Sequence, residues 1–316
     1  MATASQSNSL RERKTHDLNE ADPNAVPGES DATPAVKHDR RTLTWNEIPA
    51  WQRDNEYILS GYRRAQYSWR GCAHSVFGFN IQTHLLGALL FVGLLGTFYH
   101  TSLAPYETAA WQDLVVFMIV LSAAVFCLLA SSWYHTFSVH SEQVAIRCHA
   151  FDYAGIVVLT VGSFFPCIYY EFYCDTHLQI LYLSLIVLVG LGAAYIVLDP
   201  EYSQPTHRGA RTKVFIALGL SAIFPVVHGL LTHGLRKLLY EMGFGWLVAS
   251  GALYISGALL YANRIPERLS PGKFDYFFAS HQIFHVCVVL AALSHYMCVL
   301  TAFEHWHAQA EPHCSL

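Results

Sequence analysis

His281 and His285 lie four residues apart, and this pair is the strongest chemical signal in the sequence. On a helix that spacing places both side chains on one face, about 6 Å apart along the axis, as a chelating pair requires. His135, near the end of another apolar stretch, adds a third imidazole. Three protein nitrogens with one position open to water are typical of catalytic zinc sites, whereas closed four-ligand sites are structural. The pattern therefore predicts Zn²⁺ held by these three histidines.

Two further polar residues lie near these histidines in the pattern. Ser131 precedes His135 by one helical turn, so both side chains are expected on the same face. Asp152 stands at the start of the next apolar stretch. We expect Asp152 to act as a general base on a water, or to orient a histidine. We expect the Ser131 hydroxyl to donate to a substrate carbonyl oxygen as negative charge develops there.

Each of these residues also has a simpler interpretation. A histidine pair with this spacing can occur on a helix that binds no metal, and His135 could be an interfacial hydrogen-bonding residue. Serine often packs between membrane helices, and Asp152 could pair with His149. The metal hypothesis is favoured because ionisable residues are costly at membrane depth, and several share one depth here. The other histidines are interpreted as packing, loop or tail residues, with His305, His307 and His313 in the tail.

The composition predicts the elements that must position these residues. Of the 316 residues, 53% are hydrophobic and 13% are charged, whereas soluble domains have about 25% charged residues. Apolar stretches of roughly 20 residues, the length that crosses a bilayer as a helix, recur along the chain. They fall near 81–99, 113–135, 149–171, 178–198, 214–233, 244–262 and 281–303. The sequence therefore predicts an all-α integral membrane protein with seven transmembrane helices.

The distribution of basic residues predicts the orientation of these spans. The side that carries the N-terminus holds 17 Lys and Arg residues, whereas the opposite side holds two, Arg236 and Lys237. By the positive-inside rule we expect a cytosolic N-terminus and an extracellular or lumenal C-terminus, in the plasma membrane or an endomembrane. This orientation is the reverse of that of G-protein-coupled receptors. It places the three histidines, Ser131 and Asp152 at the cytosolic face.

Four regions are expected along the chain. Residues 1–43 are polar without periodicity, which indicates a disordered cytosolic tail. Residues 44–80 are a juxtamembrane region with a short amphipathic helix at the membrane surface, or an ordered cytosolic collar. Residues 81–303 form the seven-helix domain, and residues 304–316 an extracellular or lumenal tail.

Cysteine usage and net charge exclude two further interpretations. Seven of the eight cysteines lie in or beside apolar stretches, where we expect them to act as small hydrophobic residues rather than as disulfides. A net charge of -4 offers no basic surface for nucleic acid.

Four blocks of the sequence resemble the progestin and adipoQ receptor family, which is related to haemolysin III. They read IPAWQRDNEYILSGYR at 48–63, SSWYHTF at 131–137, FDYAGI at 151–156 and RIPERLSPGKFDYFFASHQIFH at 264–285. The resemblance covers about residues 45–303. One departure is Phe77, which stands where family members often carry an acidic residue near the start of the first span.

The resemblance implies a seven-helix protein with a cytosolic N-terminus and a zinc site similar in design to that of the alkaline ceramidases. The residues that it implies for this site are His135, His281 and His285 as ligands, with Asp152 and Ser131 beside them. Some family members bind adiponectin, but no motif in this sequence encodes that interaction.

Two functions are predicted from these observations. The first is a zinc-dependent amide hydrolase that acts on a ceramide-like membrane lipid and releases a fatty acid. The second is a signalling receptor that affects lipid or zinc homeostasis, in which zinc is a structural clamp between the second and seventh spans and an extracellular protein ligand is unidentified. A transporter is disfavoured, because the spans show no repeated halves and few charges at the membrane midplane.

Overall fold

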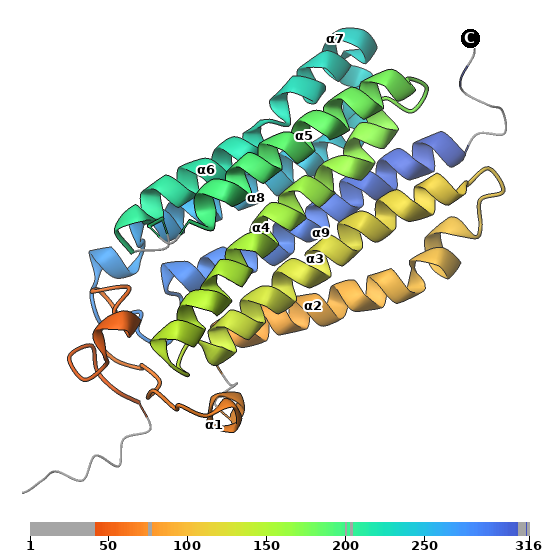
Figure 1. The fold of residues 1–316 in the computed structure, drawn as a ribbon. Helices are drawn as coiled ribbons and strands as arrows, with labels where there is room; N and C mark the ends of the chain where they lie inside the picture. Colours follow the sequence, from red (N-terminus) through yellow and green to blue (C-terminus); the bar gives the residue numbers. More distant parts are fainter. Residues whose placement is uncertain (1–41, 75–77, 200, 203–204, 309–313, 315–316) are drawn as a thin grey trace, which may run out of the picture. The chain divides into compact units, whose positions relative to one another are not determined.

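The structure is a computed structural model that describes residues 42–74, 78–199, 201–202, 205–308 and 314. These residues are mainly helical (Figure 1), and an isolated β bridge joins Leu43 to Tyr62. The long helices are α2 (Phe79–Phe98), α3 (Trp111–Phe137), α4 (Glu142–Glu171), α5 (Thr176–Val197), α6 (Arg208–Leu220), α7 (Ile223–Tyr240), α8 (Phe244–Asn263) and α9 (Ser280–His307). The short ones are η1 (Ala50–Gln52), α1 (Trp69–His74), η2 (Tyr99–Leu103), η3 (Pro205–His207) and η4 (Glu267–Leu269). Nearly all of the predicted N-terminal tail, together with Phe77 and His313, lies outside the described residues.

Seven helical segments within the described residues are long and apolar enough to cross a membrane, which confirms the predicted fold class. They cover Phe79–Leu103, Trp111–Phe137, Glu142–Glu171, Thr176–Val197, Arg208–Tyr240, Phe244–Leu269 and Ser280–His307. Most extend beyond the predicted apolar stretches, because the helices continue through polar residues at their ends. The chain is therefore a multi-pass integral membrane protein.

The fifth span differs most from its prediction, because it consists of two helices instead of one. Helix α6 ends at Leu220 and α7 begins at Ile223. Pro225 lies in the first turn of α7, where a backbone N–H forms no hydrogen bond within the helix, so proline is tolerated there. In the interior of a continuous helix the same proline would remove a backbone hydrogen bond, which explains why α6 does not continue through it. A second departure from helical geometry lies at Gly234, whose φ of 81° is readily reached only by glycine.

Helix α3 is central to the packing. It packs against α2 on one side and α4 on the other, while α9 packs against α8 and α2 (Figure 1). Phe117, Leu121 and Leu128 of α3 are fully buried in the main apolar cluster. Gly155 permits the close approach of α4, because a Cβ there would lie 3.0 Å from the Cα of Cys127. Large buried side chains and small contact residues thus hold the helices that carry the polar residues of interest.

The bundle has two ends that differ in chemistry. The proximal end is defined here as the one where α2, α4, α6 and α9 begin, and the distal end as the one where α3, α5 and α8 begin. The segment 42–68 lies at the proximal end, where Leu59 N–H and the Ser60 hydroxyl donate to Asp275 at 2.9 and 2.6 Å. Helix α1 follows this segment, and Ser68 Oγ accepts a hydrogen bond from Gly71 N–H (3.4 Å). The position of this region at a membrane surface stays a prediction.

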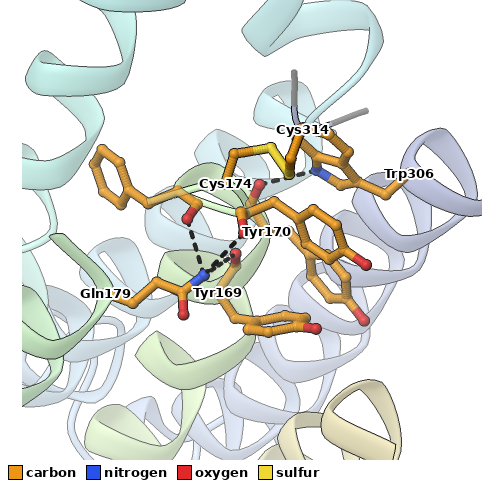
Figure 2. Close-up of a disulfide and its surroundings, with 8 residues drawn as sticks. Tyr169, Tyr170, Cys174, Gln179, Trp306 and Cys314 are labelled. Carbon is orange, nitrogen blue, oxygen red and sulfur yellow. Dashed lines mark hydrogen bonds between the residues drawn. A yellow bond between two sulfur atoms is a disulfide. The ribbon is translucent and has the colours of Figure 1, made fainter. Parts of the chain in front are cut away.

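A disulfide between Cys174 and Cys314 joins the turn after α4 to the C-terminal residues (Figure 2). The prediction that the cysteines do not form disulfides is therefore wrong for this pair. The two are 140 residues apart in sequence, so no local pattern indicated their proximity. The six remaining cysteines are free thiols, as predicted.

A buried hydrogen-bond network at the distal end corrects a second prediction. His305 and His307 were expected in the tail, but α9 continues through both. His307 Nε2 lies 3.2 Å from the carboxylate of the buried Asp113, which also accepts hydrogen bonds from the Tyr170 hydroxyl and the Ala110 N–H, each at 2.8 Å. Because these partners come from α3, α4 and α9, the network ties three helices together. It lies beside Trp306, whose indole N–H donates to the Tyr170 carbonyl (2.9 Å; Figure 2).

Candidate metal centre

The structure brings three predicted metal ligands together at the proximal end. His135 lies in the last turn of α3, and His281 and His285 lie in the first two turns of α9. Each histidine offers one ring nitrogen, and the three nitrogens lie within 4.8 Å of one another. The ring centroids are 4.8–4.9 Å apart in all three pairs. The helical spacing on α9 and the end of α3 therefore produce a compact imidazole cluster.

The hydrogen bonds around these rings fit a metal ion. Nδ1 of His285 lies 3.1 Å from the Asn80 carbonyl oxygen and 3.4 Å from the Thr83 hydroxyl, which leaves Nε2 as the nitrogen for a metal. Nε2 of His135 is buried without a hydrogen-bond partner. A buried ring nitrogen without a partner is costly in the absence of a ligand. The donor set of three imidazoles suits zinc among the common metals.

Ser131 and Asp152 line the same cavity as His281 and His285. The Ser131 side chain is buried, and its hydroxyl lies beside the Asp152 carboxyl and makes no hydrogen bond to the backbone, so both groups face the cavity together. The His149 ring contacts two tyrosine rings, with centroids 4.8 Å from Tyr134 and 4.2 Å from Tyr153. The alternative pairing of Asp152 with His149 stays a prediction.

The cavity has a volume of about 480 Å³ and follows the interior of the bundle from the histidines to the distal half. Its walls are largely apolar and come from α3, α4, α6, α7, α8 and α9; Ile156, Leu159 and Val299 are examples. Near the histidines the lining becomes polar and cationic, with Arg208 and Arg211 of α6. The Arg211 guanidinium lies over the ring of Tyr153, 5.0 Å from its centroid. An apolar chain with a polar head fits this distribution.

Several residues of the site were missed by the sequence analysis. The His84 ring stacks on the His285 ring, with centroids 3.7 Å apart and planes 11° from parallel. Arg63 donates hydrogen bonds to the His135 carbonyl and, at 3.3 Å, to the Thr136 carbonyl. Burial lowers the pKa of the Arg63 guanidinium from its ordinary value, but a guanidinium stays charged at neutral pH. The sequence placed both residues near the site. His84 lies one residue after Thr83 and four after Asn80, and Arg63 is the last residue of the first block that carries the family resemblance.

A seven-helix membrane protein with a histidine cluster at one end of a largely apolar internal cavity is the class that the fold and the site define. Residues 78–296 match the family described as "Haemolysin-III related", and the chain belongs to that family. The family resemblance inferred from the four sequence blocks is therefore confirmed.

Relatives from three organisms support the same assignment. The chain is 38% identical over 261 residues to "Progestin and adipoQ receptor-like protein 1" of Caenorhabditis elegans, covering 81% of this chain and 59% of that protein. It is 38% identical over 257 residues to "Adiponectin receptor protein" of Drosophila melanogaster, covering 80% and 57%. It is 35% identical over 277 residues to "ADIPOR-like receptor IZH2" of Saccharomyces cerevisiae, covering 86% and 87%. The match thus spans less than two thirds of the first two relatives and most of the third.

Proposed function

We propose that this chain is a zinc-dependent hydrolase that cleaves the amide of a ceramide-like membrane lipid and releases a fatty acid. One observation carries the proposal: three imidazole nitrogens lie within 4.8 Å of one another, and two of these histidines, His281 and His285, line the polar end of a largely apolar cavity of about 480 Å³. The cavity volume is within the range of sites that enclose drug-sized ligands. Apolar walls suit an acyl chain, and the polar head is where its amide would lie.

His135, His281 and His285 would hold the ion, and zinc bound there supplies an activated water and polarises a carbonyl oxygen. The contact of His285 Nδ1 with the Asn80 carbonyl oxygen orients its ring so that the other nitrogen faces the centre. Arg63 donates to the carbonyl of His135 and so holds the backbone of the ligand on α3.

Asp152 and Ser131 would provide the acid–base chemistry and the carbonyl contact. The Asp152 carboxylate accepts a proton from the attacking water and returns it to the leaving amine nitrogen as the carbon–nitrogen bond breaks. The Ser131 hydroxyl, which makes no hydrogen bond to the backbone, donates to the carbonyl oxygen as that oxygen becomes negative. The apolar walls of the cavity exclude bulk water and strengthen both interactions.

Replacement of Asp152 tests the mechanism. Asp152→Asn keeps the shape of the side chain and removes its basicity, so ceramide turnover by the purified protein is expected to fall by about 10²–10⁴-fold. The zinc content, measured by mass spectrometry, is expected to stay at the wild-type value. Equal turnover in wild type and variant contradicts the proposal.

Two serines that line the cavity provide a matched control. The Ser131 hydroxyl lies beside Asp152 and makes no hydrogen bond to the backbone, whereas the hydroxyl of Ser163 donates to the Thr160 carbonyl (2.7 Å) of its own helix. Ser131→Ala is expected to lower turnover by roughly the effect of one oxyanion donor, about 10²-fold. Ser163→Ala is expected to leave turnover unchanged.

A second candidate function is a signalling receptor in which zinc is structural. The ligands come from α3 and α9, so a bound ion would join these helices, and the names of the relatives contain the word receptor. Removal of zinc by a chelator discriminates between the two functions. A structural ion predicts a large fall in melting temperature, whereas a mainly catalytic ion predicts lost turnover with a small fall.

A further inference from the structure

Glu267 is a completely buried carboxylate in the connection between α8 and α9. Burial of a carboxylate is costly unless donors surround it. Three donors do so: the Ser280 backbone N–H at 2.7 Å, the Ser280 hydroxyl, and the Asn55 side-chain amide at 3.0 Å. The carboxylate is therefore held in one place by groups from two distant parts of the chain.

Two of these donors belong to the first residue of α9. The residue before the helix is Ala279, whose methyl side chain forms no capping hydrogen bond. The first N–H groups of a helix have no intrahelical partners, and the positive end of the helix dipole favours a negative charge. Glu267 supplies both an acceptor and the charge, and so takes the place of the missing cap. Ser280 directly precedes His281, so this contact fixes the turn that carries the first ligand on α9.

Asn55 extends the network to the N-terminal segment. Its side-chain oxygen accepts from the Tyr57 N–H (3.2 Å), which sets the direction of its amide toward Glu267. The Tyr57 carbonyl accepts from the Gly272 N–H (3.0 Å), which seats the segment on the connection between α8 and α9. The same segment reaches α3 through Arg63, which donates to the carbonyl of His135.

We propose that Glu267 is a positioning residue for the metal centre, and that Asn55 makes the N-terminal segment part of the support for that centre. The network fixes the first turn of α9 while Arg63 fixes the last turn of α3, so the three ring nitrogens stay within 4.8 Å of one another. The inference rests on the zinc site of the proposed function. It adds that Glu267, after the end of α8, and Asn55 of the N-terminal segment set the affinity of that site.

Zinc affinity of the full-length purified protein tests the proposal. The protein is stripped of metal and titrated with zinc in competition with a fluorescent chelator. Loss of a hydrogen-bond partner of a metal ligand typically weakens binding by about 10–100-fold, and Glu267 acts one residue from His281, through Ser280, so we expect the lower end of that range. Glu267→Gln and Asn55→Ala are therefore each expected to raise the zinc Kd by about tenfold.

Asp275→Asn is the matched control. Asp275 holds the same N-terminal segment to the same connection, through the Leu59 N–H and the Ser60 hydroxyl, but these contacts reach neither α3 nor α9. Its replacement is expected to lower the melting temperature and to leave the zinc Kd unchanged. Cobalt substitution adds a spectroscopic readout, because the visible absorption of Co²⁺ reports ligand geometry. Glu267→Gln is expected to change this spectrum, and Asp275→Asn to preserve it.

The outcomes separate this inference from the proposed function. Wild-type affinity in both Glu267→Gln and Asn55→Ala, with only a lower melting temperature, overturns the positioning role and leaves the zinc site intact. If Glu267→Gln does not fold, Asn55→Ala decides, because it removes only the two side-chain hydrogen bonds of a residue outside the long helices. Wild-type protein that binds no zinc overturns the proposed function and this inference together.

Discussion

The histidines on α9 differ in what their ring nitrogens face. Nε2 of His295 lies 3.0 Å from the Ser163 carbonyl and 3.6 Å from the Cys167 sulfur, and His307 contacts Asp113 and Thr108. These rings are satisfied by protein groups of α3 and α4 or nearby loops. His281 and His285 instead face His135 and the polar head of the cavity. The surroundings of each ring thus separate structural histidines from candidate ligands on a single helix.

The comparison of His281→Ala with His295→Ala follows from that difference. Both histidines lie on α9 and line the cavity. His281→Ala is expected to lose the bound zinc, because it removes one of three ligands, whereas His295→Ala is expected to retain it and to lose stability. Metal analysis of the two purified variants measures the outcome. Similar zinc contents in the two variants would contradict the assignment of ligands.

At this scale the sequence predicted which histidines lie together better than it predicted their surroundings. His281 and His285 were found because helical spacing alone places them on one face, and His135 because span ends share a depth. The contacts of Glu267 with Asn55 and of His307 with Asp113 join residues 212 and 194 positions apart. No local pattern encodes such pairs, because they depend on which helices become neighbours.

At the scale of the elements, the long apolar stretches predicted the number of spans, because the length needed to cross a bilayer is fixed by the helical rise. The interruption between α6 and α7 was not predicted, since the average hydropathy of that stretch stays high across it. The residue that indicates this interruption is Pro225, because proline disrupts the interior of a helix whatever the hydropathy of the stretch around it.

Helix α5 offers a matched pair of glycines for testing helix packing. A Cβ at Gly190 would lie 2.4 Å from Cγ2 of Val161 on α4, whereas a Cβ at Gly192 would meet nothing within 4 Å. Gly190→Ala is therefore expected to destabilise the protein by about 1–3 kcal/mol through overpacking. Gly192→Ala is expected to leave stability unchanged or slightly raised, since alanine favours a helix. Thermal unfolding in detergent measures both, and the reverse order would contradict this packing.

At the scale of the whole molecule, the two ends of the bundle carry different chemistry. The proximal end holds the histidine cluster with Arg208 and Arg211, and the distal end holds the disulfide. Disulfides persist in oxidising compartments, outside the cytosol. This placement agrees with the orientation predicted from the basic residues, in which the distal end is extracellular or lumenal.

Glycosylation mapping tests this orientation. An Asn-X-Ser/Thr acceptor joined through a linker after Leu316 is expected to be glycosylated, because the modification takes place in the lumen of the secretory pathway. The same acceptor placed before Met1 is expected to remain unmodified. Gel mobility before and after removal of the glycan measures both fusions. Glycosylation of the N-terminal fusion alone would reverse the predicted orientation.

The separation of the ligands between α3 and α9 has a consequence for how the protein matures. A ribosome that adds roughly 5–20 residues per second takes on the order of ten seconds to proceed from His135 to His281. A nascent chain that has inserted its first six spans therefore contains His135 but neither His281 nor His285, and the histidine cluster is incomplete. Under the proposed function, metal loading follows the synthesis of α9, so a cell short of zinc is expected to accumulate inserted protein that a later supply completes without new synthesis.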